Sequence, residues 1–193
     1  MKAKYIIPEV NTNGLVARYK IWSDWAGSST FFDYSMNGYT ASIVGTANYK
    51  EYPGQHLDGT DEYLKFGGGP ASVSTVLMWV KPDSITLRID YPIDLNGTDY
   101  LTIVNGTLTK TGFAGGTAVL YTDGVAASTT VTTRWHLIGI TDTVAKNASG
   151  LNIGRVGANY FDGLVGETLL YNKVLNEGEI KNIYNVTRWR YGV

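Results

Sequence analysis

Asn-Gly and Asp-Gly pairs recur along this chain, and four of them constrain its fold more than any other feature of the sequence. These four are Asn37-Gly38, Asp58-Gly59, Asn105-Gly106 and Asp123-Gly124. All four predict turns, and Asn105-Gly106 and Asp123-Gly124, each between runs of β-formers, are the strongest short-range signals for a β-hairpin. The chain is therefore expected to fold mainly as antiparallel strands joined by tight turns.

The runs between these turns have the alternating pattern that is typical of strands. Strands are predicted within nine segments: 15–21, 29–44, 56–66, 73–81, 101–110, 118–128, 134–141, 151–154 and 163–171. The segment 73–81 is the most apolar, and its even-numbered and odd-numbered residues are both hydrophobic, so both of its faces should be covered. About ten to twelve short strands with frequent turns are typical of an antiparallel sandwich or barrel.

One short helix is predicted directly after the last strand, within residues 175–184. Asn176 is suited to the N-cap, and Glu179 lies three residues further on, so the two can form a capping box. Leu175 and Ile180 occupy the two positions of a hydrophobic staple. Because a helix of about nine residues is not stable alone, its apolar face is expected to pack on the sandwich.

Composition excludes several classes of protein. The chain has 193 residues and a net charge of −1, which argues against a nucleic-acid binder. It has no cysteine, which excludes a disulfide scaffold, a thiolate zinc site and a cysteine nucleophile. No apolar run is long enough for a membrane helix or for a signal peptide. No linker divides the chain, so a single domain over 1–193 is predicted, with 186–193 as a C-terminal tail.

The order of these elements resembles the laminin-G-like, concanavalin-A-like jelly-roll domains. The segments that carry the resemblance are "GLVARYKI", "FDYSMNG", "LDGTDEYLKF", "VLMWVKP", "RWHLIGIT", "LNIG" and "YFDGLVGETLLYNKVLNEGEIKNIYN". They cover nearly the whole chain. The resemblance implies an all-β fold in which two antiparallel sheets pack face to face as a jelly-roll sandwich, closed by one short C-terminal helix.

Two departures from the family pattern refine this resemblance. The Tyr121–Val125 segment precedes Trp135-His136, an order associated with a subtype in phage virion and bacterial surface proteins. Many relatives carry Asp-Glu before the last strand, whereas this chain has Gly166-Glu167. An Asp that contributes to a calcium site in some relatives is therefore absent. The C-terminal "YNVTRWRYGV" also resembles the ends of laminin-G-like proteins from phage particles.

The carboxylates do not have the spacing of a glycosidase. A retaining enzyme needs an acid and a nucleophile about 5–5.5 Å apart, and jelly-roll glucanases that resemble this fold place them on an E-x-D-x-x-E strand, which is missing here. Asp58, Asp61 and Glu62 surround a turn, so they are interpreted as turn-capping residues. Glu177 and Glu179 are explained by helix capping. The chain is therefore expected not to be an enzyme.

The remaining polar motifs also have structural interpretations. His56 and His136 are interpreted as structural histidines, and the glycine-rich "FGGGP" (66–70) is interpreted as a turn, because it lacks the residues of a phosphate loop. "DYSMNG" (33–38) begins like a calcium loop, but Val44 stands where an EF-hand needs its bidentate acid. An Asx-type turn is predicted there, and an irregular calcium site stays open as the alternative. No cofactor is expected.

Exposed aromatic residues are candidates for ligand contact. Trp79 and Trp135 lie within predicted strands and are assigned to the core. Trp22 and Trp25 lie in a loop beside polar residues, and they are candidates for a sugar-binding surface. Near the C-terminus, Arg188, Trp189 and Arg190 are candidates for contact with a partner, because exposed Trp and Arg are enriched at interface hot spots.

Two hypotheses about function follow. The first is a non-enzymatic structural protein of a phage or virus particle: a head decoration, fibre or tail component. It would be located in the virion, would contact itself as a homo-oligomer or other particle proteins, and could bind glycans. The alternative is a carbohydrate-binding or adhesion module of an extracellular bacterial surface protein. A glycosidase or lyase is disfavoured by the carboxylate spacing, and neither nucleic acid nor a membrane is expected as a partner.

Overall fold

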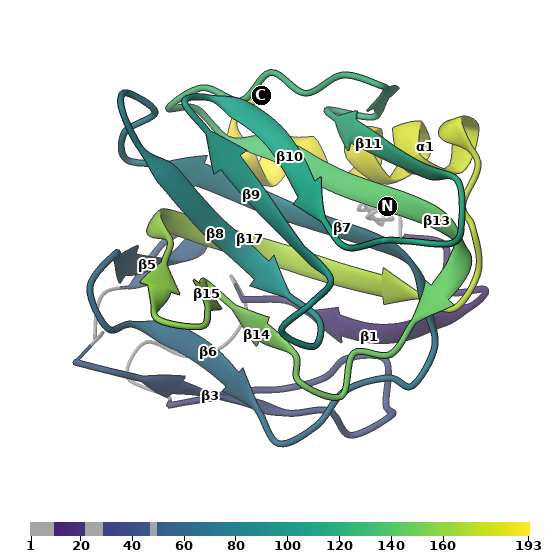
Figure 1. The fold of residues 1–193 in the computed structure, drawn as a ribbon, viewed down its shortest axis with the longest axis horizontal. Coiled ribbons are helices and arrows are strands. Elements are labelled where there is room, and N and C mark those ends of the chain that lie inside the picture. Colours follow the sequence, from purple (N-terminus) through teal and green to yellow (C-terminus); the bar gives the residue numbers. More distant parts are fainter. Residues whose placement is uncertain (1–9, 22–28, 47–49) are drawn as a thin grey trace, which may run out of the picture.

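The computed structural model describes residues 10–21, 29–46 and 50–193, and these form two antiparallel sheets packed face to face (Figure 1). The strand order of the eight-stranded sheet is β12 (Val125–Ala126), β11 (Ala118–Thr122), β13 (His136–Lys146), β7 (Val73–Pro82), β17 (Asp162–Tyr171), β5 (Gly54–Asp58) and β4 (Lys50–Glu51), with β1 (Leu15–Tyr19) also paired to β17. The strand order of the seven-stranded sheet is β10 (Thr107–Thr111), β9 (Tyr100–Val104), β8 (Ile89–Asp94), β14 (Asn152–Ile153), β6 (Tyr63–Phe66), β3 (Ala41–Val44) and β2 (Thr30–Phe31). A separate short hairpin pairs β15 (Arg155–Val156) with β16 (Asn159–Tyr160). The expected all-β jelly-roll sandwich is confirmed.

Two of the four predicted turns are two-residue hairpins, whereas Asp58-Gly59 connects β5 to β6 in the other sheet, and Asn37-Gly38 lies in a longer connection between β2 and β3. Asn105 and Gly106 have φ values of 49° and 77°, and they join β9 to β10. Asp123 and Gly124 have φ values of 56° and 77°, and they join β11 to β12. Two consecutive residues with positive φ match the twist of a two-residue hairpin, and Asn, Asp and Gly tolerate that conformation best.

Strand β8 is a correction to the sequence-based assignment, which predicts no strand between 82 and 100. The strand spans Ile89–Asp94 and contains Pro92, a residue that cannot donate a ladder hydrogen bond. The pairing of β8 with β9 shifts register between Asp90 and Ile93, so the proline lies at an irregularity of the ladder. A bulge is one of the few places where a strand accepts proline.

The main hydrophobic core lies between the two sheets, and the central strand β7 shows how the sequence pattern builds it. Val76, Met78 and Val80 point into this core, which also contains residues of the seven-stranded sheet. Leu77 and Trp79 point to the opposite face of β7 and belong to a second cluster. The expectation that both faces of this strand are covered is confirmed.

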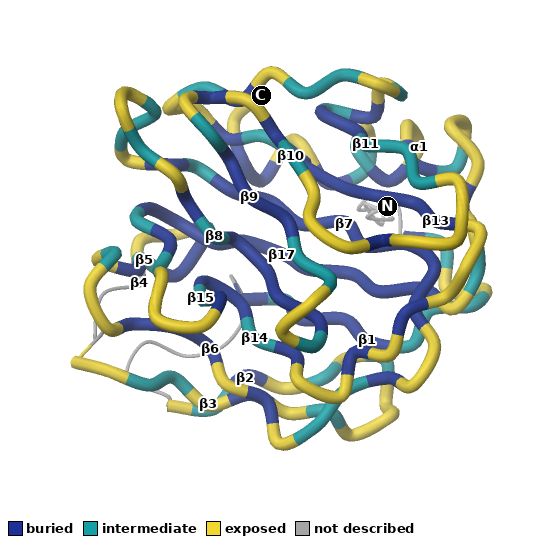
Figure 2. Tube along the Cα trace, viewed as in Figure 1, coloured by how far each residue is buried: buried dark blue, intermediate teal, exposed yellow. Residues whose placement is uncertain are grey.

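A second core lies on the outer face of the eight-stranded sheet, beneath helix α1 (Glu177–Thr187). Figure 2 shows the central strands of this sheet, β7, β13 and β17, as mostly buried chain. The predicted capping box is present: the Asn176 side chain accepts from the backbone N–H of Glu179, and the Glu179 carboxylate accepts from that of Asn176. Ile180 and Ile183 are fully buried against the sheet. The predicted helix is confirmed and is slightly longer than expected.

The chain continues from α1 into a short 3₁₀ helix, η1 (Arg188–Tyr191). The ring of Tyr191 stacks on Trp79, with 4.2 Å between the ring centroids. The buried carboxylate of Glu167 accepts from Arg190 at 2.6 Å and pairs with Arg18 at 2.8 Å. Of the residues predicted as a tail, 186–187 are thus in α1 and 188–191 in η1, and Arg190 and Tyr191 tie η1 to the sandwich. No helix of the described residues is long and apolar enough to cross a membrane.

Candidate functional site: a neutral groove beside β3 and β6

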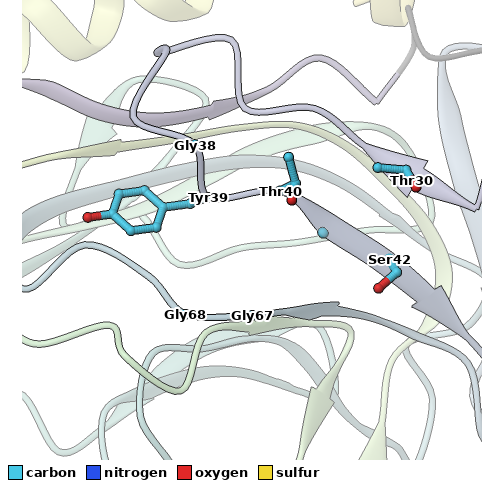
Figure 3. Close-up of a pocket in the computed structure, with 8 residues that line it drawn as sticks. Thr30, Gly38, Tyr39, Thr40, Ser42, Gly67 and Gly68 are labelled. Carbon is cyan, nitrogen blue, oxygen red and sulfur yellow. The ribbon is translucent and has the colours of Figure 1, made fainter.

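A surface groove of about 490 Å³ opens where the pairing of β3 with β6 ends. The last paired residues are Ala41 and Phe66, and beyond them the two segments diverge (Figure 3). The groove is lined by Thr30, Gly38, Tyr39, Thr40, Ala41, Ser42, Gly67 and Gly68. It lies on the seven-stranded sheet, whereas α1 covers the eight-stranded sheet.

The three consecutive glycines beside the groove have different structural roles. A Cβ atom at Gly69 would collide with the backbone carbonyl oxygen of Ala148, so packing requires glycine there. A Cβ atom at Gly67 or Gly68 would meet no atom within 4 Å, and neither residue has a positive φ. The fold therefore requires glycine at 69 but not at 67 and 68, where the absence of side chains keeps the groove open.

The residues that line the groove are uncharged. Thr30, Tyr39, Thr40 and Ser42 supply hydroxyl groups that can both donate and accept hydrogen bonds. Figure 3 shows the Thr30 and Ser42 side chains beside the groove and the Tyr39 ring extending along it. Such a surface offers an aromatic ring, several hydroxyls and open backbone, and it suits a neutral, hydroxyl-rich ligand.

Tyr39 is held in place by the turn that precedes it. Its backbone N–H donates to Oδ2 of Asp33 at 3.2 Å, and its carbonyl accepts from the Tyr19 hydroxyl at 2.8 Å. Burial raises the pKa of Tyr19 far above its usual value, with a further increase from Asp33, so this hydroxyl stays protonated and can donate. The groove wall is therefore anchored to the core.

The Asp33 loop is the Asx-type turn that the sequence predicts. The Oδ1 atom of Asp33 accepts from the backbone N–H groups of Arg18, at 3.0 Å, and Ser35, at 2.9 Å. With the bond from Tyr39, both carboxylate oxygens of Asp33 are engaged with backbone donors. The sequence alternative of an irregular calcium site at 33–38 gains no support from this arrangement, which explains the loop by hydrogen bonding alone.

Of the site residues predicted from the sequence, Arg188, Trp189 and Arg190 lie apart from the groove. Trp22 and Trp25 fall outside the described residues. Arg188 is exposed, and Trp189 is 54% exposed with its indole N–H donating to the carbonyl of Val186. Arg190 is buried on Glu167, so its guanidinium is engaged inside the fold. Contact of Arg188 and Trp189 with a partner stays a prediction.

The aromatic residues assigned to the core are there. Trp79 is fully buried and Trp135 is 9% exposed. Both belong to the second core, where the Trp79 indole N–H donates to the Thr187 hydroxyl at 3.0 Å. This prediction is confirmed, although the sequence could not show that the helix, rather than the second sheet, covers these rings.

The polar residues with structural interpretations form local networks. His136 lies between Asp123 and Thr132, with 2.8 Å to each from its two ring nitrogens. His56 contacts Asp83 at 2.9 Å. Asp58 accepts from the backbone of the turn that it begins, as expected for a turn-capping residue. Sequence reasoning missed the groove itself, and the run of three glycines at 67–69 was the available signal.

Comparison with known proteins identifies the fold but no family. No protein-family model and no curated protein matches this chain. Among solved structures, the chain is similar to domain 4 of an extracellular GH43 arabinanase from Geobacillus stearothermophilus in complex with arabinotriose, with 17% identity, a TM-score of 0.61, and 88% of this chain and 98% of that chain covered.

Two further structures share the fold over part of their length. A mutant sialidase of Trypanosoma rangeli that displays trans-sialidase activity has 19% identity and a TM-score of 0.62, with 96% of this chain and 35% of that chain covered. The receptor-binding domain of a botulinum neurotoxin of C/D mosaic serotype has 10% identity and a TM-score of 0.54, with 92% of this chain and 52% of that chain covered. At these identities the likeness shows the shared β-sandwich alone.

Proposed function

We propose that this chain is a non-catalytic, carbohydrate-binding module that holds a neutral glycan in the groove beside β3 and β6. The observation that carries the proposal is the groove itself, where hydroxyl side chains and the Tyr39 ring surround backbone left open by Gly67 and Gly68. An aromatic ring can cover the apolar face of a sugar while nearby hydroxyls bind its polar groups. Few precisely placed polar groups in a pocket are what fixes the orientation of a ligand.

The solved structures that share this fold support the carbohydrate-binding hypothesis over the hypothesis of a particle protein. The arabinanase domain was seen with arabinotriose, a sialidase with sialic acid, and a botulinum neurotoxin binding domain with a sialylated ligand. None of the neighbours named here is described as a particle protein, so the virion hypothesis has no support from them. We accordingly place the proposed module in an extracellular or surface protein.

The uncharged lining of the groove favours a neutral ligand over a charged one. Sialic acid carries a carboxylate, and its recognition is favoured by cationic or other charge-assisted donors. The residues that line the groove include none that is cationic, and they include no carboxylate either. A neutral glycan therefore fits better than a sialylated one. The lack of carboxylates in this lining also supports the non-catalytic part of the proposal, because glycosidases of the common type need a pair of them.

A glycan array with a groove-filling variant tests the proposal. Gly67→Trp places a large side chain in the groove at a position where the backbone allows it. Ala145→Trp is the matched control, because Ala145 is exposed on β13 of the other sheet. The wild type and the control should bind neutral oligosaccharides, among them arabino-oligosaccharides, and Gly67→Trp should weaken binding at least about tenfold.

Two results would contradict the proposal. A blank array with folded wild-type protein would show that the chain does not bind the glycans tested. If Gly67→Trp left glycan binding unchanged, the binding site would lie elsewhere on the chain. Mass spectrometry of the bound glycans after prolonged incubation checks the absence of catalysis. Shortened oligosaccharides would show that the chain is an enzyme.

A further inference from the structure

A cluster of three titratable side chains lies near the ends of neighbouring strands of the eight-stranded sheet, away from the groove. His56, Asp83 and Asp162 each offer one ligand atom, and these atoms all lie within 4.8 Å of one another. His56 is on β5, Asp162 begins β17, and Asp83 directly follows β7. Because β17 lies between β7 and β5, three adjacent strands bring together residues that are far apart in sequence.

The backbone fixes the positions of these three residues. Strand β17 pairs with β5 so that Asp162 faces Asp58 and Leu164 faces His56. Since side chains alternate along a strand, His56 and Asp162 lie on the same face of the sheet. The backbone N–H of Asp83 donates to the carbonyl of Asp162 at 3.1 Å, which ties the third residue to the second. The cluster is thus held by the sheet rather than by mobile loops.

We propose that His56, Asp83 and Asp162 form a binding site for a divalent transition-metal ion of the Zn²⁺ type. Nε2 of His56 lies 2.9 Å from Oδ2 of Asp83. That separation is a hydrogen-bond distance, and the two atoms would move apart to the roughly 3.3–3.6 Å between neighbouring ligands of a tetrahedral ion whose bonds to N and O are about 2.0–2.2 Å long. An imidazole favours Zn²⁺ over Ca²⁺ and Mg²⁺, which prefer oxygen ligands alone.

The charges around the cluster favour a bound cation. Asp58 lies directly opposite Asp162 in the pairing of β5 with β17, and like charges at such positions repel one another. Arg88 compensates part of this charge, because it pairs with Asp162 at 3.0 Å and with Asp90 at 2.7 Å. Asp90 is 1% exposed, its Oδ1 also accepts from the backbone of Asp162, and its Oδ2 has no hydrogen-bond partner in the described structure. Negative charge therefore exceeds its compensation next to the cluster.

The coordination shell would be open on the solvent side. The side chain of Asp83 is 45% exposed and that of His56 is 28% exposed. Three protein ligands with one open position are typical of zinc sites that also bind water or another ligand. The site would accept a hydroxyl or carboxylate oxygen from a bound molecule, independently of whether the groove binds a glycan.

Calorimetry on the chelator-treated full chain, with Zn²⁺ and separately with Ca²⁺, tests the site. The expected result is one Zn²⁺ per chain and much weaker Ca²⁺ binding. With Zn²⁺ at about 100 times its Kd, the Tm should rise by roughly 5–10 °C. His56→Gln and Asp83→Asn should each weaken Zn²⁺ binding at least about tenfold, because each removes one ligand.

The second histidine provides a matched control, because the chain has only two. His136 contacts the carboxylate of Asp123 and the hydroxyl of Thr132, and among the described residues it belongs to no group of three possible ligands, so His136→Gln should leave Zn²⁺ binding intact. Circular dichroism shows whether each variant is folded, and a chemical-shift change of the His56 ring on titration with Zn²⁺ locates the ion without any variant. Unchanged Zn²⁺ affinity in folded His56→Gln would overturn the proposal. So would Ca²⁺ binding as tight as Zn²⁺ binding, which would point to carboxylates alone, such as the adjacent group of Asp58, Asp61 and Glu62.

Discussion

The two ends of the short β3–β6 strand pair differ in their chemistry. Where the pair ends at Ala41 and Phe66, the chain supplies hydroxyls and bare glycine backbone and forms the groove. Beyond the other end, Gly45 leaves room for Asp61 and Glu62, and a Cβ there would lie 2.9 Å from each. The comparison shows that one sandwich can place a neutral surface and an acidic one at opposite ends of the same strands.

Carboxylates at the acidic end are destabilised by burial and by neighbouring negative charge, whereas the residues that line the groove include no carboxylate. Burial raises the pKa of Glu62, and the nearby charge of Asp58 raises it further. Burial also raises the pKa of Asp90 in spite of its bond to Arg88. Ionised carboxylates crowded together cost stability, so such an end is maintained either by compensating cations or for a function. The groove end has no comparable cost, and its openness depends on two glycines.

The largest expected effect separates the glycines that the fold needs from those that keep the groove open. Gly69→Ala should lower the free energy of unfolding by about 3 kcal/mol, because its Cβ collides with the rigid backbone of Ala148. Gly67→Ala should change it by about 0.5 kcal/mol at most and could raise it, because the position allows a side chain. Urea unfolding of the two variants measures both values. Equal destabilisation would show that Gly67 is also structural.

A carboxylate placed in the groove should make the groove end acidic, like the other end of the β3–β6 pair. Ser42 lies opposite Lys65 in the pairing of β3 with β6, so Ser42→Asp can pair with that lysine and keep the fold. The affinity for a neutral glycan should fall about tenfold, because a carboxylate is desolvated when the ligand binds. Fluorescence titration gives the affinity, and Ser42→Asn is the uncharged control. An unchanged affinity would place the ligand away from Ser42.

Removing one hydroxyl should have a smaller effect. Thr40 is exposed beside the groove, and Thr40→Ala deletes one hydrogen-bonding group without touching the core. A single hydrogen bond contributes about 1 kcal/mol, so the affinity should fall about fivefold while the Tm stays unchanged. Thr107→Ala, on the exposed face of β10, should alter neither quantity. A fall in Tm for Thr40→Ala would mean that this hydroxyl supports the fold instead.

The smallest effect concerns the acidic end and depends on pH. Burial raises the pKa of Asp162, Arg88 opposes the increase, and Asp83 adds to it. The folded state therefore binds this proton more tightly than the unfolded state. Its contribution to stability is complete at low pH and is lost as the pH rises above about 4 and through the folded-state pKa. Asp162→Asn should match the wild type at low pH and become relatively more stable as the pH rises.

Urea unfolding of both proteins in chelator, at several pH values, gives this difference. A constant difference across the series would mean that Asp162 has the same pKa in the folded and unfolded states. If the wild type instead gained stability over the variant as the pH rose, Arg88 would outweigh the burial of Asp162. The chelator keeps metal binding at His56 out of the measurement.

Local sequence patterns predicted much of this molecule. Asn105-Gly106 and Asp123-Gly124 predicted two hairpin turns, the alternation of β7 predicted a strand covered on both faces, and Asn176 with Glu179 predicted the start of α1. These features depend on residues within a few positions of one another. Strand β8 escaped prediction because Pro92 argues against a strand unless a register shift accommodates it, and that shift depends on the partner strand β9.

The sequence by itself determined the fold class, the turns and the capped helix, because each follows from the local conformational preferences of a few neighbouring residues. Only the tertiary structure decided the sites. Gly67 and Gly68 line a groove because β3 and β6 diverge there, and His56 meets Asp83 and Asp162 because three strands lie side by side. Arg190 is a candidate for partner contact by its residue type alone, but in the structure it is buried and pairs with the carboxylate of Glu167. Contacts between distant segments depend on strand order and register, which local preferences do not specify.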